Sequence, residues 1–256
     1  MLQAMSQTKQ GRNAGDNQGP VVVILLGPPG CGKGTQSREL SRALGLIHIS
    51  SGDLLRKAAS EDSDLGHTVR TTMNAGELVS DHLVCQMVMA RTAQPDCQRG
   101  VILDGFPRTM EQAKFLCPLL PLRQTIAVDL KLSPTVLVER ILGRLTCPSC
   151  GEIYNIHSRP PRRTGTCDRD SALLGRRGDD SEATVRQRLI DYERQIHPLA
   201  DHFRELNILQ EINADVPPAV LSAQLCTLVR TAIGLSDKKL SVSLSAKPRE
   251  TKRSGQ

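Results

Sequence analysis

The strongest constraint on the fold of this 256-residue chain is the run PVVVILLGPPGCGKGT near its N-terminus. Residues 21–26 are all apolar, which is typical of a strand that is buried on both faces of a parallel sheet. A glycine-rich loop follows at once, and an amphipathic segment begins after the loop. Because parallel strands must be joined by crossover helices, this unit predicts an α/β fold with a doubly wound parallel sheet.

The loop fits the phosphate-binding pattern G-x-x-x-x-G-K, in which small residues let backbone N–H groups surround a phosphate. Lys33 is expected to reach the outer phosphates of a nucleotide. Gly34 stands where a Ser or Thr ligand to Mg²⁺ usually follows the lysine, and Thr35 comes one place later. A plain glycine turn with an incidental lysine is the weaker interpretation. The predicted nucleotide-phosphate site comprises Gly30, Cys31, Gly32, Lys33, Gly34 and Thr35.

Further strands are expected in GVILDG, QTIAVDLKL and LNILQEI, which alternate with helical segments. We expect about five parallel strands flanked by helices. Two segments interrupt this alternation: 50–79, which contains short helices, and 143–180, which is rich in Pro, Gly, Arg and Cys. Both are predicted to be insertions over the carboxyl edge of the sheet, where such folds bind ligands. The core then comprises 21–49, 80–142 and 181–234, between a disordered leader (1–20) and a disordered basic tail (235–256).

Composition argues against nucleic-acid and membrane partners. The net charge is +6, but six basic and only two acidic residues lie in the tail, so the body is close to neutral. Aromatic residues make up 2% of the chain, too few for a base-stacking surface. No apolar run is long enough to span a bilayer, and the leader lacks the hydrophobic region of a signal peptide. We expect a cytoplasmic monomer, with a mitochondrial or other organellar location as the alternative.

Four residues in the second insertion have the spacing C-x2-C-x16-C-x2-D, which matches a zinc ribbon except at its last position. Zn²⁺ accepts carboxylate oxygen beside thiolate sulfur, so the aspartate is an adequate fourth ligand. Asp168 and His157 are rival fourth ligands, and a redox pair or free thiols are the non-metal interpretations. The predicted structural zinc site comprises Cys147, Cys150, Cys167 and Asp170.

Four motifs in order, GPPGCGKGTQ, ISSGDLLR, DGFPRTMEQA and RRGDD followed by VRQRL, resemble the adenylate kinase family over about residues 21–234. The resemblance implies a core, a monophosphate-binding insertion at 50–79 and a lid at 143–180. It implies reversible, Mg²⁺-dependent phosphoryl transfer from ATP to AMP, giving two ADP. Some members have a lid with three cysteines and an aspartate at matching places. The rival hypotheses are a GTP donor or another monophosphate acceptor and, in a different class, a non-catalytic zinc-ribbon protein that binds nucleotides or nucleic acid.

The same resemblance implies roles for residues of the acceptor pocket. Gln112 resembles the glutamine that reads adenine, which favours AMP over UMP or CMP. Asp104 resembles the carboxylate that orients Mg²⁺. The implied AMP-binding residues are Ser51, Arg56, Leu78, Val79, Gly105, Arg108, Gln112, Arg177 and Arg188.

Several basic residues are implied to surround the transferring group. Phosphoryl transfer depends on positioning and on neutralising charge, so converging arginines suit it. The motif VERILGR is predicted to place Arg140 and Arg144 four residues apart on one helical face, where both would bind the donor. Taken alone, two arginines spaced in this way more often lie on a solvent-exposed face of a helix. The implied catalytic residues are Lys33, Arg108, Arg144, Arg177 and Arg188, and no histidine is expected to serve as a base.

Overall fold

A computed structural model describes residues 19–75, 77, 79–178 and 180–234, so the predicted leader and tail lie almost wholly outside the described residues. Its main sheet has the strand order β2-β3-β1-β4-β7, and every neighbouring pair is parallel. The doubly wound parallel sheet is therefore confirmed. The strands are β1 (Val21–Leu26), β2 (Ile47–Ser50), β3 (Gly100–Asp104), β4 (Thr125–Lys131) and β7 (Leu209–Asn213).

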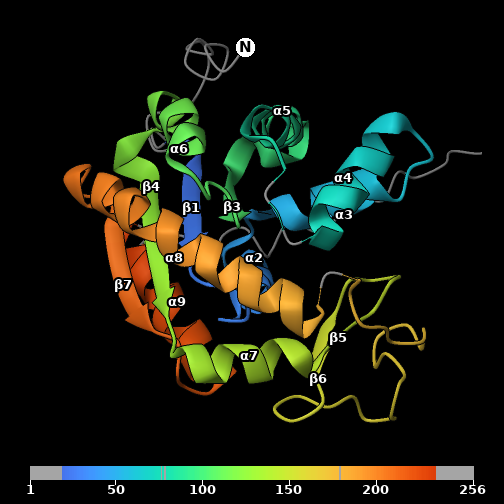
Figure 1. Cartoon of the computed structure of the whole chain (residues 1–256). Helices are drawn as coiled ribbons and strands as arrows, with labels where there is room; N and C mark the ends of the chain where they lie inside the picture. The colour runs from blue at the N-terminus through green and yellow to red at the C-terminus, as the bar shows by residue number, and fades with distance from the viewer. Residues whose placement is uncertain (1–18, 76, 78, 179, 235–256) are drawn as a thin grey trace, which may run out of the picture.

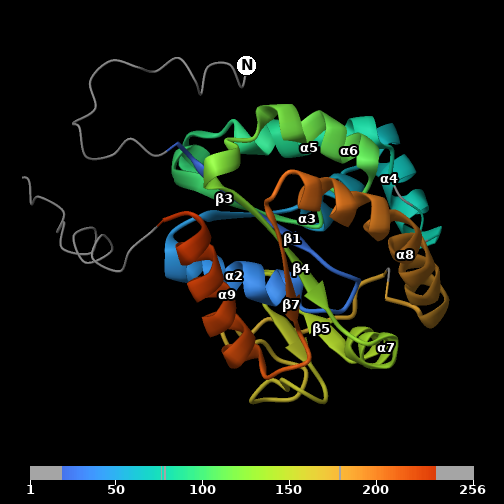
Figure 2. The same ribbon diagram turned by 90° about the vertical axis from the view of Figure 1, so that its left-hand side faces the viewer.

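Helices cover both faces of this sheet, which explains why the first strand is apolar throughout (Figure 2). One face carries α5 (Asp81–Thr92), α6 (Met110–Leu116) and α8 (Glu182–Glu205), and the other carries α2 (Lys33–Leu44) and α9 (Pro218–Ala232). Val22 and Ile24 pack into the first core, whereas Val23 and Leu25 pack into the second. Each fully buried aliphatic side chain contributes about 1.5–3 kcal/mol of transfer free energy. Because successive side chains of β1 are buried on opposite faces of the sheet, the strand is held firmly, and so is the start of the loop that follows it.

The two predicted insertions lie near the same end of the molecule (Figure 1). The helical insertion, 50–79, contains α3 (Ser51–Ala59) and α4 (Asp64–Ala75). The segment 143–180, called here the cysteine segment, begins where α7 (Pro134–Leu142) ends and contains the antiparallel pair β5 (Arg144–Thr146) and β6 (Ile153–Asn155). Short 3-10 helices occupy Pro95–Arg99, Cys117–Leu119 and Leu122–Gln124.

The predicted helical face shared by Arg140 and Arg144 is wrong. Helix α7 ends at Leu142, Gly143 forms its C-cap, and Arg144 is the first residue of β5, paired with Asn155. Glycine is a poor helix former, and the strand pairing beyond it supplies the backbone hydrogen bonds that a longer helix would have made. The two arginines therefore approach from different elements.

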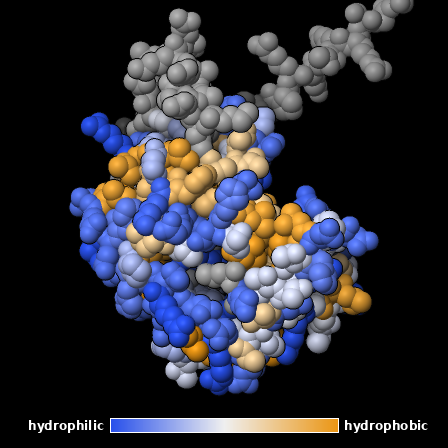
Figure 3. Space-filling view, turned by 45° about the horizontal axis from the view of Figure 1, so that its top comes forward, coloured by the Kyte–Doolittle hydropathy of each residue, from blue (hydrophilic) through white to orange (hydrophobic). Residues whose placement is uncertain are grey.

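Hydrophobic side chains on the face drawn in Figure 3 gather in separate patches among hydrophilic ones. Within the described part of the chain, no helix combines the length and the apolar character needed to cross a membrane.

Candidate nucleotide-binding site

The glycine-rich loop joins β1 to α2 and places Lys33 at the first position of that helix. Gly30 and Gly32 have φ angles of +86° and +102°, a region that side chains disfavour, so glycine is needed at these turns. The Lys33 ammonium donates to the carbonyl oxygens of Gly27 at 2.7 Å and of Pro28 at 2.9 Å. The ammonium is thus held over the mouth of the loop, where backbone N–H groups at a helix start favour an anion.

Two adjoining cavities lie past the carboxyl ends of β1, β2 and β3, because residues that follow each strand line them. The apolar cavity includes Ser51, Leu55, Val79, Val84, Gly105, Gln112 and Ile196. The polar cavity includes Gly30, Cys31, Gly32, Gly34, Thr35, Asp104, Arg140, Arg144 and Arg177. The cations Lys33, Arg56, Arg108 and Arg188 line both. The junction of the cavities is therefore lined by four cationic side chains.

The floor of the apolar cavity is tightly packed around Gly105. The Ser51 hydroxyl donates to the Gly105 carbonyl at 2.6 Å, and Arg108 Nε donates to the same oxygen at 2.8 Å. Gly105 has a φ of +70°, and a Cβ there would lie 2.7 Å from the Arg108 guanidinium. Of the predicted pair Leu78 and Val79, Val79 lines this cavity, whereas Leu78 lies outside the described residues.

Arg177 has an environment suited to an anion. Its Nε is buried and has no hydrogen-bond partner among the described residues. Burial, together with repulsion from Arg144 and Arg56, lowers the pKa of Arg177 to about 10. A guanidinium so placed gains hydrogen bonds and loses repulsion when a phosphate enters between the arginines.

Asp104 ends strand β3 and lies against the start of α2, where a Cβ on Gly34 would be 3.4 Å from its Oδ2. His48 Nε2 lies 3.1 Å from the same oxygen. Burial favours a higher pKa for Asp104, but the hydrogen bond from His48 and the charges of His48 and Lys33 outweigh it and hold the pKa below its usual value. An ionised carboxylate beside a phosphate loop fits a hydrated Mg²⁺ ion.

His48 and strand β2 were not singled out from the sequence. The strand IHIS is only four residues long, and the sequence offers little to separate it from the helices on either side. Its parallel register with β3, which pairs Ser50 with Asp104, is what brings His48 toward that carboxylate. A usable signal was the alternation of apolar and polar residues directly before Ser51.

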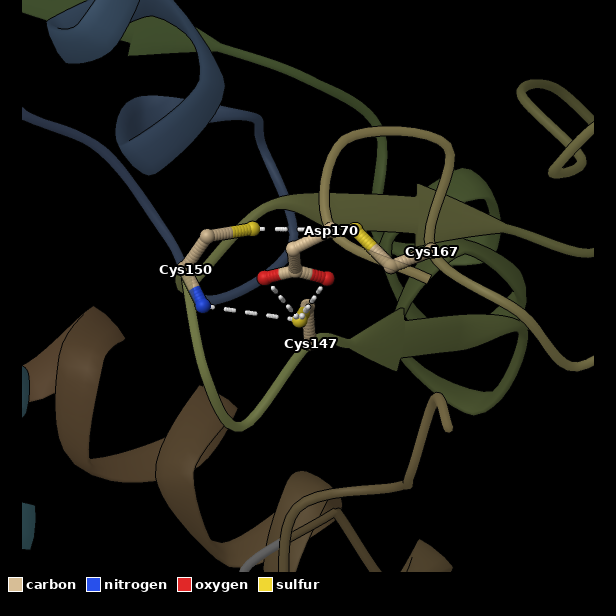
Figure 4. A group of neighbouring side chains, drawn as sticks. All are labelled: Cys147, Cys150, Cys167 and Asp170. Carbon is tan, nitrogen blue, oxygen red and sulfur yellow. Dashed lines mark hydrogen bonds between the residues drawn. The ribbon is translucent and has the colours of Figure 1, made fainter. Parts of the chain in front are cut away.

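The four predicted metal ligands come together (Figure 4). One ligand atom from each of Cys147, Cys150, Cys167 and Asp170 lies within 4.8 Å of the others. The Cys150 and Cys167 sulfurs are 3.6 Å apart, too far for a disulfide. The Ala172 amide donates to Asp170 at 3.1 Å and contributes most to holding the pKa of that carboxyl below its usual range. Three thiols and a carboxylate so arranged can hold a metal ion of the zinc type.

The rival fourth ligands have other positions. Asp168 Oδ1 accepts a hydrogen bond from the Arg162 amide at 2.9 Å and is not a member of the cluster. His157 is exposed and is not a member either.

The cysteine segment also contacts the core. Arg42 of α2 lies 3.6 Å from Glu152, and a Cβ on Gly34 would be 3.3 Å from Ile153 of β6. Within the segment, Arg144 and the buried Asp180 form an ion pair that joins its two ends. The segment is therefore seated over the polar cavity.

Comparison with known proteins identifies the family. A family model described as Adenylate kinase matches residues 25–208. An adenylate kinase of Anaeromyxobacter dehalogenans strain 2CP-C is 42% identical over 207 residues, which cover 79% of this chain and 97% of the relative. Those of Moorella thermoacetica and Nitrosococcus oceani are each 40% identical, over 78% and 82% of this chain and 94% and 99% of the relatives. The chain belongs to the adenylate kinase family and is a phosphotransferase.

Proposed function

We propose that this chain catalyses reversible transfer of the γ-phosphoryl group from ATP to AMP, giving two molecules of ADP. The observation that carries the proposal is the pair of adjoining cavities, which share Lys33, Arg56, Arg108 and Arg188 at their junction. An apolar pocket suits a base, a phosphate loop suits the donor, and a cationic junction suits the group that passes between them.

The donor nucleotide would occupy the polar cavity. The backbone of Gly30, Cys31, Gly32, Gly34 and Thr35 would surround its phosphates, and Lys33 would move from its loop carbonyls to the outer phosphates. Arg140 would contact the donor base, and Arg144 would bind donor phosphate.

The acceptor would occupy the apolar cavity, its base beside Val79 and Gln112 and its phosphate at the junction. Ser51, Arg56 and Arg108 would hold that phosphate. Leu78 and Gly105 complete the proposed acceptor set, together with Arg177 and Arg188 nearer the transferring group.

In the transfer step, an AMP phosphate oxygen attacks the γ-phosphorus of ATP, and the bond from that phosphorus to the β–γ bridging oxygen breaks. The attacking oxygen is already ionised at neutral pH, so no side chain needs to remove a proton. Lys33, Arg108, Arg144, Arg177 and Arg188 would stabilise the negative charge spread over the transferring group and the leaving ADP.

Two metal ions are part of the proposal. Mg²⁺ bound to ATP supplies charge neutralisation and orientation of the phosphates. Asp104 would orient that ion through water. Zinc would be held by Cys147, Cys150, Cys167 and Asp170, and would tie together a segment with a very small apolar core.

The proposed domain organisation follows from these assignments. The core (21–49, 80–142 and 181–234) carries the phosphate loop, 50–79 binds the monophosphate, and 143–180 is a lid that closes over the donor. We propose a cytoplasmic monomer whose partners are ATP, AMP and ADP, with an organellar location as the alternative and neither nucleic acid nor membrane as a partner.

Steady-state kinetics over a panel of donors and acceptors tests this function. ATP with AMP should give the highest kcat/KM, and product analysis should show two ADP per turnover. A preference for GTP as donor, or for CMP or UMP as acceptor, would replace the proposed substrates while leaving the reaction class intact.

A further inference from the structure

The side-chain amide of Gln112 is held by two partners whose hydrogen-bonding roles cannot be exchanged. Its Nε2 donates to Asp81 Oδ1 at 2.7 Å, and its Oε1 accepts from the backbone N–H of Arg108 at 2.8 Å. A carboxylate only accepts and a backbone N–H only donates, so the amide has a single consistent orientation. The hydrogen-bond network thus assigns which end of the amide is oxygen and which is nitrogen.

Asp81 is itself fixed. It is the first residue of α5, and its Oδ2 accepts from the Thr109 hydroxyl at 2.8 Å. Thr109 caps helix α6 by accepting from the Gln112 backbone N–H at 3.2 Å. The carboxylate therefore joins the start of α5 to the cap of α6 and to the amide. Gln112 is 2% exposed, so the amide has little room to find other partners.

The fixed amide retains one hydrogen on Nε2 and one lone pair on Oε1, and Gln112 lines the apolar cavity. Adenine carries an N–H donor at its six position, whereas hypoxanthine and guanine carry a carbonyl acceptor there. If Gln112 Oε1 is held toward the six position, it accepts a hydrogen bond from the amino group of adenine and repels the carbonyl oxygen of hypoxanthine or guanine. If the amide could rotate, its NH₂ group would take that place and the selectivity would be lost.

We infer that Asp81 is a positioning residue that sets the base selectivity of the acceptor pocket by preventing rotation of the Gln112 amide. The inference rests on the proposed function, because it takes Gln112 as the group that contacts the acceptor base. Asp81 does not contact the nucleotide; it acts through Gln112. An asparagine at position 81 can donate or accept, so it removes the carboxylate's opposition to a rotated amide and leaves the Arg108 N–H as the remaining restraint.

The test compares AMP and IMP, which differ at the six position and at N1, as acceptors with saturating ATP. In Asp81→Asn the ratio of kcat/KM for AMP to that for IMP should fall about tenfold, the scale of one mismatched buried hydrogen bond. The KM for ATP should stay within about twofold, since the polar cavity is untouched. Glu111→Gln, which removes an exposed carboxylate from α6, the helix that carries Gln112, should keep the wild-type ratio.

A merely structural role for Asp81 would lower activity with both nucleotides and leave the ratio unchanged, which would overturn the inference. Asp81→Asn on a Gln112→Met background should have no further effect on the ratio, and an additional fall there would also overturn it. Asp81→Glu keeps a group that only accepts hydrogen bonds, and should retain the selectivity for AMP over IMP.

If the asparagine variant does not fold, Asp81→Ser makes the same test, because a hydroxyl also donates or accepts. Failure of the proposed function is distinct: the wild-type protein would then form no ADP from AMP.

Discussion

The guanidinium of Arg144 and the carboxylate of Asp180 form an ion pair, with Nε 2.8 Å from Oδ2, that joins the two ends of the cysteine segment. Arg144 begins β5, and Asp180 directly precedes Ser181, the N-cap of α8. The Asp180 side chain is 2% exposed, so the pair is well shielded from water. The pair holds Arg144 in the wall of the polar cavity.

Asp180→Asn should therefore lower kcat/KM for ATP by about 10- to 100-fold, because the loss of one partner of a buried charged hydrogen bond costs roughly 1.5–3 kcal/mol. The measurement is steady-state kinetics with ATP varied at saturating AMP. Glu182→Gln, whose exposed carboxylate lies two residues further along, serves as the matched control. Equal effects of the two substitutions would contradict a specific role for the Arg144–Asp180 pair.

Gln112→Ala should weaken the acceptor selectively. Removal of the amide leaves the base without its hydrogen-bonding partner, so KM for AMP should rise about tenfold while KM for ATP changes little. Isothermal titration with AMP alone provides the corresponding affinity. An unchanged preference for AMP over CMP in this variant would remove the base-reading role from Gln112.

The cysteine cluster should hold about one zinc ion per chain when the protein is purified under reducing conditions, as elemental analysis would measure. Asp170→Cys should retain the metal, because four thiolates are a common zinc set, whereas Cys150→Ser should reduce the zinc content. Removal of the metal should make the cysteine segment sensitive to proteolysis before the core. A metal-free protein in which this segment stays resistant would contradict the zinc assignment.

Glu152 should stabilise contact between the cysteine segment and the core. Its buried carboxylate lies 2.8 Å from Arg159 within the segment and 3.6 Å from Arg42 on α2. Burial opposes ionisation, but Arg159, Arg38 and Arg169 outweigh it and hold the pKa of Glu152 below its usual value.

Glu152→Gln should lower the melting temperature at pH 7 and raise KM for ATP a few-fold. A carboxyl with a depressed pKa stabilises the fold fully above its unfolded value of about 4.3, and this contribution disappears as pH falls through the lower folded value. The difference in melting temperature between wild type and variant should therefore narrow below about pH 4.5. A difference that is the same at pH 7 and pH 4 would show that packing, not charge, accounts for the effect.

Much of this arrangement could be predicted from the sequence because short patterns have strong local consequences. The run before Gly27 predicts a buried parallel strand, and the glycines after it allow only a few loop conformations. The ligand spacing from Cys147 to Asp170 predicts two knuckles, and the structure brings those four residues together.

The remainder depends on tertiary contacts that local patterns do not encode. The partnership of His48 with Asp104 needs the parallel register of β2 with β3. Asp81 meets Gln112 only because α5 and α6 pack on the same face of the sheet. The helical pattern through Arg144 failed because strand pairing in β5 overrode the local 3.6-residue period.

The most direct test of the account is the initial rate of ADP formation from ATP and AMP by the purified protein and by Lys33→Ala, measured side by side. Lys33 is the cation of the phosphate loop, and its Nζ makes its closest bonds to Gly27 and Pro28 of that same loop. The wild type should form ADP rapidly and only when AMP is present. Lys33→Ala should lose at least about 1,000-fold of this rate, on the scale of other transition-state cations in phosphoryl transfer, with a melting temperature near that of the wild type. Near-normal turnover by a folded Lys33→Ala protein would contradict the assignment of the phosphate loop as the site of transfer.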